Sequence, residues 1–361
     1  MKKALKLLPI ALLLAALFAL SACGGGRVDT EGMRIALVAH SPESILDDGS
    51  FNAGAWQGIV DFANAHGMST ARGTDIEFFQ AGSATDEARI DAVESAINWG
   101  ASIIVMPGFH FIASSYQMQH LFPDTYFILL DATPGGAIAN NLVAIQYAEH
   151  QSGFLAGYAA VREGYRQLGF MGGAAVPAVV RFGHGFLQGA EYAANSLGLA
   201  QGAVTVRFDY VGAFAPDPGV ATQAGSWFAA GTEVIFAAAG GAGFSVMSAA
   251  ETAGRSVIGV DVDQHADSDT VISSAMKALA VSVYDMLRDI GTDEWRGGQA
   301  LMFDASVDGV GLPMDNSRWQ NFTQSQYNAI FRRLANESID VNNSLDMGDI
   351  LPGLNLISIV D

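Results

Sequence analysis

Short apolar runs alternate with longer amphipathic stretches along most of this 361-residue chain. Runs of strand length lie at 34–39, 76–79, 102–106, 126–130, 142–145, 167–171, 204–208, 233–236 and 256–260. Between them, apolar residues recur at helical spacing near 52–63, 86–99, 111–122, 151–162, 182–197, 218–230 and 244–253. A strand followed by a helix, repeated in this way, is typical of a parallel sheet covered by helices on both faces. The pattern therefore predicts an α/β protein.

The repeat occurs in two successive halves, and about 330 residues follow Met33, which is too many for one small core. We expect two doubly wound parallel-sheet lobes joined by a hinge, with a ligand cleft between them. The boundaries predicted are 33–146 plus 264–297 for the first lobe and 147–263 plus 298–361 for the second. The chain would then cross between lobes near Tyr147, Asp263 and Gly298.

The tail is less regular than the rest of the chain. Residues 301–304 and 307–312 are predicted as strands, 322–336 as a helix, and 351–360 as a possible edge strand.

The amino terminus has the composition of a secretory signal. Lys2, Lys3 and Lys6 precede an apolar run at 7–20, and this run is too short and too cleavable for a membrane span. Residues 1–22 are therefore predicted to be removed.

The stretch Leu20-Ser21-Ala22-Cys23 resembles the lipobox of bacterial lipoproteins. The resemblance implies that Cys23 becomes the first residue and carries lipid, which anchors the protein on the outer face of the cell membrane. A plain signal peptide with a Cys here by chance is the alternative. Residues 23–32 are glycine-rich at their start and are predicted to be a flexible tether. Since Cys23 is the only cysteine, no internal disulfide can form.

The charge of the chain is strongly acidic. Without the three signal lysines, 15 basic residues remain against 37 acidic ones, a formal net charge of −22. Such a chain binds nucleic acid backbones poorly, so no nucleic acid partner is expected.

The stretch from Arg34 to Gly58 is the first strand–loop–helix unit. Its loop ends in Asp47-Asp48-Gly49-Ser50-Phe51-Asn52, and either Asp48 or Ser50 can cap the following helix. Ligands of open α/β sheets bind at the carboxyl ends of the strands. Phe51 is therefore predicted as a ligand contact, with an anchor for the helix start as the alternative.

No enzyme constellation is present in the sequence. Metal-ligand spacing and Gly-x-Ser-x-Gly are both missing. The loop 239–243 lacks the Lys of a P-loop, although Gly241 would let backbone N–H groups approach a ligand hydroxyl. His40, at a strand end, faces the predicted cleft. No cofactor is expected.

Several motifs in order carry a family resemblance. They are Asp47-Asp48-Gly49-Ser50-Phe51-Asn52, Glu149 with Gly153-Phe154-Leu155-Ala156-Gly157-Tyr158, Ala239-Gly240-Gly241-Ala242-Gly243, Ile258-Gly259-Val260-Asp261-Val262-Asp263-Gln264 and Ser273-Ser274-Ala275-Met276-Lys277. Together they resemble the basic membrane protein (BMP/PnrA-like) lipoproteins, from Met33 to about Asp289. That family has the type I periplasmic-binding fold and supplies substrate-binding proteins to ABC importers. Characterised members bind purine nucleosides.

The resemblance implies roles for particular residues. Phe51, flanked by Ser50 and Asn52, would stack on one face of a base, and Phe236 or Phe214 from the other lobe would cover the opposite face. Asp131 would face the ligand. Asp261 and Asp263 would accept hydrogen bonds from ribose, and Lys277 would donate to the sugar. An inter-lobe salt bridge that only fixes the hinge is the alternative for Lys277 and Asp263.

Two departures from the family pattern concern the base. The family has Asp or Asn just after the first strand, where this chain has His40-Ser41-Pro42-Glu43, and Gly49 replaces the Lys of the family motif. His40 or Glu43 is a possible substitute. A pyrimidine nucleoside, a modified purine or another ring-containing ligand therefore stays open.

These expectations describe a lipid-anchored binding protein that hands a nucleoside to ABC permease and ATPase subunits. A ligand-sensing lipoprotein, an importer subunit for carbohydrate or amino acids, and a nucleoside-cleaving enzyme using Asp131 or Asp261 are the alternatives. The last of these lacks a paired acid or nucleophile.

Overall fold

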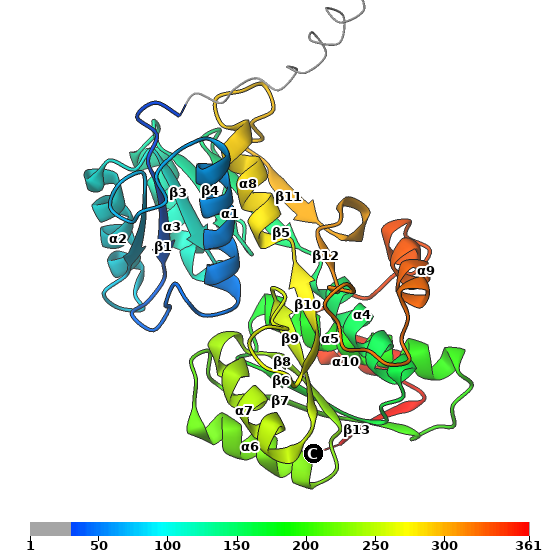
Figure 1. Cartoon of the computed structure of the whole chain (residues 1–361). Helices are drawn as coiled ribbons and strands as arrows, with labels where there is room; N and C mark the ends of the chain where they lie inside the picture. The colour runs from blue at the N-terminus through cyan, green and yellow to red at the C-terminus, as the bar shows by residue number, and fades with distance from the viewer. Residues whose placement is uncertain (1–29, 361) are drawn as a thin grey trace, which may run out of the picture. The chain divides into compact units, whose positions relative to one another are not determined.

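The computed structural model describes residues 30–360, and the residues from Met33 onward form one compact unit. It contains two sheets, each flanked by helices (Figure 1). The predicted signal peptide and Cys23 lie outside the described residues. Within the described part of the chain, no helix is long and apolar enough to cross a membrane.

The first sheet is parallel throughout. In spatial order its strands are β11 (Ala300–Phe303), β5 (Leu142–Tyr147), β4 (Tyr126–Leu130), β3 (Ile103–Pro107), β1 (Ile35–Ala39) and β2 (Ile76–Gln80). The associated helices are α1 (Phe51–Ala65), α2 (Asp86–Trp99), α3 (Ile112–Leu121) and α8 (Leu279–Asp289). The central strands β1 and β3 are buried along their whole length, as expected for a parallel sheet covered on both faces.

The second sheet is parallel except for the short antiparallel pair of β10 and β12. Its spatial order is β12 (Val310–Gly311), β10 (Val271–Lys277), β9 (Ser256–Asp261), β8 (Val234–Ala238), β6 (Gln167–Gly172), β7 (Val204–Tyr210) and β13 (Ile357–Val360). Its helices are α4 (Glu149–Glu163), α5 (Pro177–Ser196), α6 (Pro218–Ala229), α7 (Gly243–Ala253), α9 (Gln324–Ala335) and α10 (Met347–Ile350).

Strand membership differs from the predicted lobe boundaries in two places. β10 pairs with β9 in the second sheet, although 264–297 was assigned to the first lobe. β11 pairs with β5 in the first sheet, although the chain after 297 was assigned to the second. The chain therefore passes between sheets after β5, after Lys277 and between β11 and β12. Helix α8 lies against α1, side by side in Figure 1.

The strand β10 was not predicted from the apolar pattern, because Ser273 and Ser274 interrupt it. Both serines are nevertheless fully buried. Ser274 Oγ accepts a hydrogen bond from the backbone N–H of Gln264 at 3.1 Å, which offsets part of the cost of burying a hydroxyl. This strand ends at Lys277.

Helices α4 and α5 pack at unusually short range. A Cβ atom at Gly157 would overlap the carbonyl oxygen of Phe186, and one at Gly189 would overlap that of Phe154. Glycine at these positions lets the two backbones touch. Helix α5 begins at Pro177, five residues before the predicted start, with the proline in the favoured first turn.

Candidate functional site

A cavity of about 590 Å³ lies at the carboxyl ends of strands from both sheets. Its wall includes His40 after β1, Asp131 after β4, Asp261 of β9 and Lys277 of β10. Small-molecule sites of α/β proteins usually lie in a cavity at the carboxyl ends of the strands, as this cavity does. Within the described residues, no cluster of His, Cys, Asp and Glu could hold a metal ion.

Lys277 is the centre of a buried charge cluster. Its Nζ lies 2.6 Å from Asp131 Oδ2, 3.4 Å from Asp261 Oδ1 and 3.8 Å from Glu149 Oε1, and its side chain is 2% exposed. Burial alone would lower the pKa of Lys277, but the three carboxylates outweigh it and raise that pKa. The ammonium is therefore charged and links the first sheet to the second.

The carboxylates respond to burial in the opposite sense. Burial raises the pKa of Glu149 to about 7, although Lys277 opposes the shift. Burial likewise raises the pKa of Asp131, against the attraction of Lys277. Arg181 lies 3.5 Å from Glu149 and adds a second cation behind the cluster. The sequence analysis missed Arg181 and noted Glu149 only as part of a motif.

Asp131 and Asp261 share an uncommon backbone conformation. Their φ angles are +58° and +66°, in the left-handed region that Asp, Asn and Gly tolerate best. Each residue stands at the end of a strand, one in each sheet. Asp131 lines the cavity, and its Oδ1 is buried and has no hydrogen-bond partner among the described residues.

Phe51 brings an aromatic ring to this cluster. It is the first residue of α1 and lines the cavity, with the Lys277 ammonium 4.7 Å from its ring centroid. Asp48 caps the helix by accepting bonds from the backbone N–H groups of Ser50, Asn52 and Ala53. The aromatic and charged parts of the predicted site are therefore adjacent.

The polar residues beside Phe51 are engaged within the protein. Asn52 lines the cavity, but its amide nitrogen donates to Ser44 Oγ and the Ile45 carbonyl, which fixes the loop. Ser50 does not line the cavity, and its Oγ donates to Asp261 Oδ2 at 2.7 Å. Gln264 Nε2 donates to the Gly49 carbonyl at 2.9 Å. These last two bonds join the loop before α1 to the segment around the end of β9.

The two candidates for the second aromatic differ in position. Phe236 is fully buried, with ring centroids of Phe170, Phe182 and Phe186 within 5.8 Å, and it does not line the cavity. This placement removes Phe236 as a ligand contact, because its position in β8 points it into the core. Phe214 lines the cavity and is 45% exposed.

Gly241 lines the cavity as expected, beside the backbone of Phe214. Phe182, in the second turn of α5, also lines the cavity, and the centroid of its ring lies 5.4 Å from Lys277 Nζ. Phe182 is not among the predicted site residues, because it stands at the predicted start of the helix and no side chain of this helix was expected to contact a ligand.

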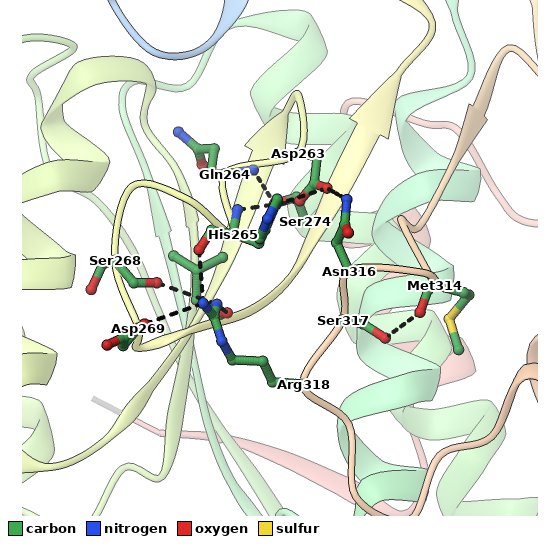
Figure 2. A network of polar contacts seen from close by, with 11 residues as sticks. Asp263, Gln264, His265, Ser268, Asp269, Ser274, Met314, Asn316, Ser317 and Arg318 are labelled. Carbon is green, nitrogen blue, oxygen red and sulfur yellow. Dashed lines mark hydrogen bonds and ion pairs between the residues drawn. The ribbon is translucent and has the colours of Figure 1, made fainter.

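Asp263 is not among the residues that line the cavity and belongs to a separate network of polar contacts (Figure 2). Its carboxylate accepts bonds from Asn316 Nδ2 at 2.8 Å and from the backbone and ring nitrogens of His265. Arg318 donates to the carbonyls of His265, Ser268 and Val271 and so holds the same loop. Asp263 therefore stabilises the loop after β9, and its predicted contact with ribose is not supported by this position.

Comparisons with known proteins show to which family the chain is related. A family model described as "ABC transporter substrate-binding protein PnrA-like" matches residues 35–344. The chain is 26% identical over 311 residues to the ABC transporter nucleoside-binding protein BmpA of Lactococcus lactis subsp. cremoris, covering 81% of this chain and 84% of that protein. It is 26% identical over 339 residues to the CD4+ T-cell-stimulating antigen of Listeria monocytogenes, covering 86% and 91%.

The fold is also found among solved structures. An ABC transporter solute-binding protein from Aeropyrum pernix K1 has a TM-score of 0.73 at 20% identity, covering 89% of this chain and 98% of that one. The likeness confirms the predicted two-lobe α/β fold. Since the family model spans most of the sequence, the chain belongs to the Bmp family of PnrA-like ABC transporter substrate-binding proteins.

Proposed function

We propose that this protein captures a purine nucleoside in the cavity between its two sheets and delivers it to an ABC permease. One observation carries the proposal. A buried Lys277–Asp131–Asp261 cluster lies directly beside the Phe51 ring, with Asp131 Oδ1 unpartnered. A nucleoside has the matching halves, since its hydroxyl-rich sugar suits the charged cluster and its flat base suits the ring.

The energetics favour a ligand with both halves. Stacking of a base on an aromatic side chain contributes about 1–3 kcal/mol, and a hydrogen bond to a charged group about 1.5–3 kcal/mol. Free ribose would forgo the stacking and a free base the charged contacts. Phe214 is the residue we assign to the second face of the base, because it is the exposed aromatic of the second sheet's wall.

Export and anchoring are part of the proposal. The signal-like residues 1–22 and Cys23 would place the protein on the outer face of the cell membrane, where a binding protein meets its solute before the permease does. Mass spectrometry of the membrane fraction tests this step. The amino-terminal peptide is expected to begin at Cys23 and to carry the added mass of a diacylglycerol group. An unmodified amino-terminal peptide that begins at another residue would contradict this expectation.

Calorimetry on the full chain in detergent tests the ligand. Adenosine, inosine, cytidine, ribose and free adenine form the panel, and the purine nucleosides adenosine and inosine are expected to bind more tightly than cytidine and far more tightly than ribose or adenine. Asp131→Asn keeps the backbone conformation and should weaken nucleoside binding at least ~10-fold by removing a charged acceptor. Asp124→Asn, on an exposed loop, is the matched control.

The ligand recovered after incubation separates capture from cleavage. Chromatography should return intact nucleoside, whereas release of free base would favour the enzyme alternative. Equal affinity of Asp131→Asn and the unaltered chain would refute the assigned sugar contact.

A further inference from the structure

The loop between β1 and α1 belongs to the first sheet but contacts segments of the second. Gln264 Nε2 donates to the Gly49 carbonyl at 2.9 Å, and Ser50 Oγ donates to Asp261 Oδ2 at 2.7 Å. A Cβ atom on Gly49 would lie 2.5 Å from the ring of Phe244 in α7, so the glycine lets the loop lie against that ring. All three contacts are made by the protein itself.

Gln264 is held by the second sheet and reaches the first with one atom. The residue is 2% exposed, its Oε1 accepts from the backbone N–H of Val260 at 2.9 Å, and its backbone N–H donates to Ser274. Gly259 makes room for the amide, because a Cβ atom there would lie 2.4 Å from Oε1. The Val260 N–H can only donate and the Gly49 carbonyl can only accept, so one orientation of the amide satisfies both.

The loop is itself tied to the first sheet, so the bond from Gln264 acts on the whole lobe. Asp48 caps α1 by accepting from three backbone N–H groups. Gln80, the last residue of β2, donates from Nε2 to the carbonyls of Pro42 and Ser44. The bond between Gln264 and the loop therefore exists only while the two sheets are close together.

We propose that Gln264 is a latch for the closed cavity, whose bond to the Gly49 carbonyl holds the two sheets together and so sets how long a captured ligand stays bound. Gln264 is a positioning residue, because neither it nor Gly49 lines the cavity. When the sheets separate, water replaces both partners of the bond. The latch should therefore slow ligand release and leave ligand entry nearly unchanged. The inference rests on the proposed function only for its probe.

Surface plasmon resonance with adenosine and inosine on the full chain in detergent separates the two rates. Gln264→Glu keeps the acceptor for Val260 but replaces the donor to Gly49 by an oxygen. Dissociation is expected to become ~10-fold faster or more, which corresponds to one buried carbonyl left without a partner, while the association rate changes less than ~3-fold. Gln264→Met has a similar length and no charge, and it should give the same faster dissociation.

Gln119 offers a matched control within the first sheet's part of the chain. It is 1% exposed, its Nε2 donates to the Ala137 carbonyl at 3.0 Å, and its Oε1 accepts from the Ala139 N–H at 2.8 Å. This amide makes the same two kinds of bond without joining the two sheets. Gln119→Met should lower the melting temperature, as Gln264→Met does, but leave the dissociation rate of adenosine unchanged.

Hydrogen exchange tests the latch without a nucleoside. Ser50 is fully buried and Asn52 is 5% exposed, so release of the loop should expose their backbone N–H groups. Peptides from residues 44–53 of the ligand-free chain are expected to exchange ~10-fold faster in Gln264→Met and at the unaltered rate in Gln119→Met. Unchanged dissociation or unchanged exchange in the Gln264 variants overturns the latch. Absence of nucleoside binding by the unaltered chain overturns the proposed function instead, and the exchange rates then decide on the latch alone.

Discussion

Replacing Glu149 by Gln should change how stability depends on pH. Glu149 is 1% exposed and lies 3.8 Å from Lys277 and 3.5 Å from Arg181. Burial nevertheless raises its pKa from 4.5 to about 7. In the pH range between these two values the folded state holds a proton that the unfolded state releases, so the folded state loses stability as pH rises.

The magnitude follows from the shift. One pKa unit is about 1.36 kcal/mol, so the contribution of Glu149 falls by about 3 kcal/mol between pH 4.5 and pH 8. Glu149→Gln stays neutral and loses this term. The free energy of unfolding of the variant, relative to the unaltered chain, should therefore rise by about 2–3 kcal/mol from pH 5 to pH 8.

Urea unfolding followed by circular dichroism at pH 5, 6, 7 and 8 measures this difference. Glu87→Gln, on an exposed position of α2, is the control and should give a difference that is flat with pH. A flat difference for Glu149→Gln, or one that falls as pH rises, would refute the reasoning. Carboxylates far from the Lys277 cluster keep the same surroundings in both proteins, so their titration cancels in the comparison.

Two further predictions concern glycines. Gly157→Ala would push a methyl group into the carbonyl of Phe186 and should destabilise the protein by about 2 kcal/mol or more. Gly225→Ala, with open space around it in α6, should be neutral or stabilise by up to about 1 kcal/mol. Thermal unfolding measures both variants, and equal melting temperatures would contradict the packing argument. Gly49→Lys should lower both the melting temperature and nucleoside affinity, because φ is +59° and the Phe244 ring lies 2.5 Å from a Cβ there. Adding Phe244→Ala should recover part of both losses, and a single variant that behaves like the unaltered chain would contradict this contact.

The fold was predictable because its signal is repeated. Buried parallel strands such as β1 and β3 are continuous apolar runs, and helices such as α2 carry their caps in the sequence, with Thr85 at its start and Gly100 at its end. The missed strand β10 contains two buried serines, and one of them, Ser274, accepts a hydrogen bond from the backbone N–H of Gln264, a contact that the apolar pattern does not show. The lobe crossings depend on which strands pair, and pairing is a long-range property that local patterns do not encode.

The site residues were predictable where they stand at the carboxyl end of a strand, because such residues lie at the edge of the sheet where ligands bind. Asp131, Asp261 and Lys277 all stand at strand ends, and the structure brings them together. Phe236 is the middle residue of β8, and Asp263 lies two residues beyond the end of β9. Neither residue ends a strand, and the structure places Phe236 in the core and Asp263 in the loop network of Arg318.

The left-handed backbone of Asp131 and Asp261 limits how these two positions can change over generations. Most side chains would strain the main chain there, so drift is confined in practice to Asp, Asn and Gly. A single nucleotide exchange converts an Asp codon to an Asn codon. Each position can thus lose one negative charge in one mutational step without refolding, so the charge preference of the cavity can evolve independently of its shape.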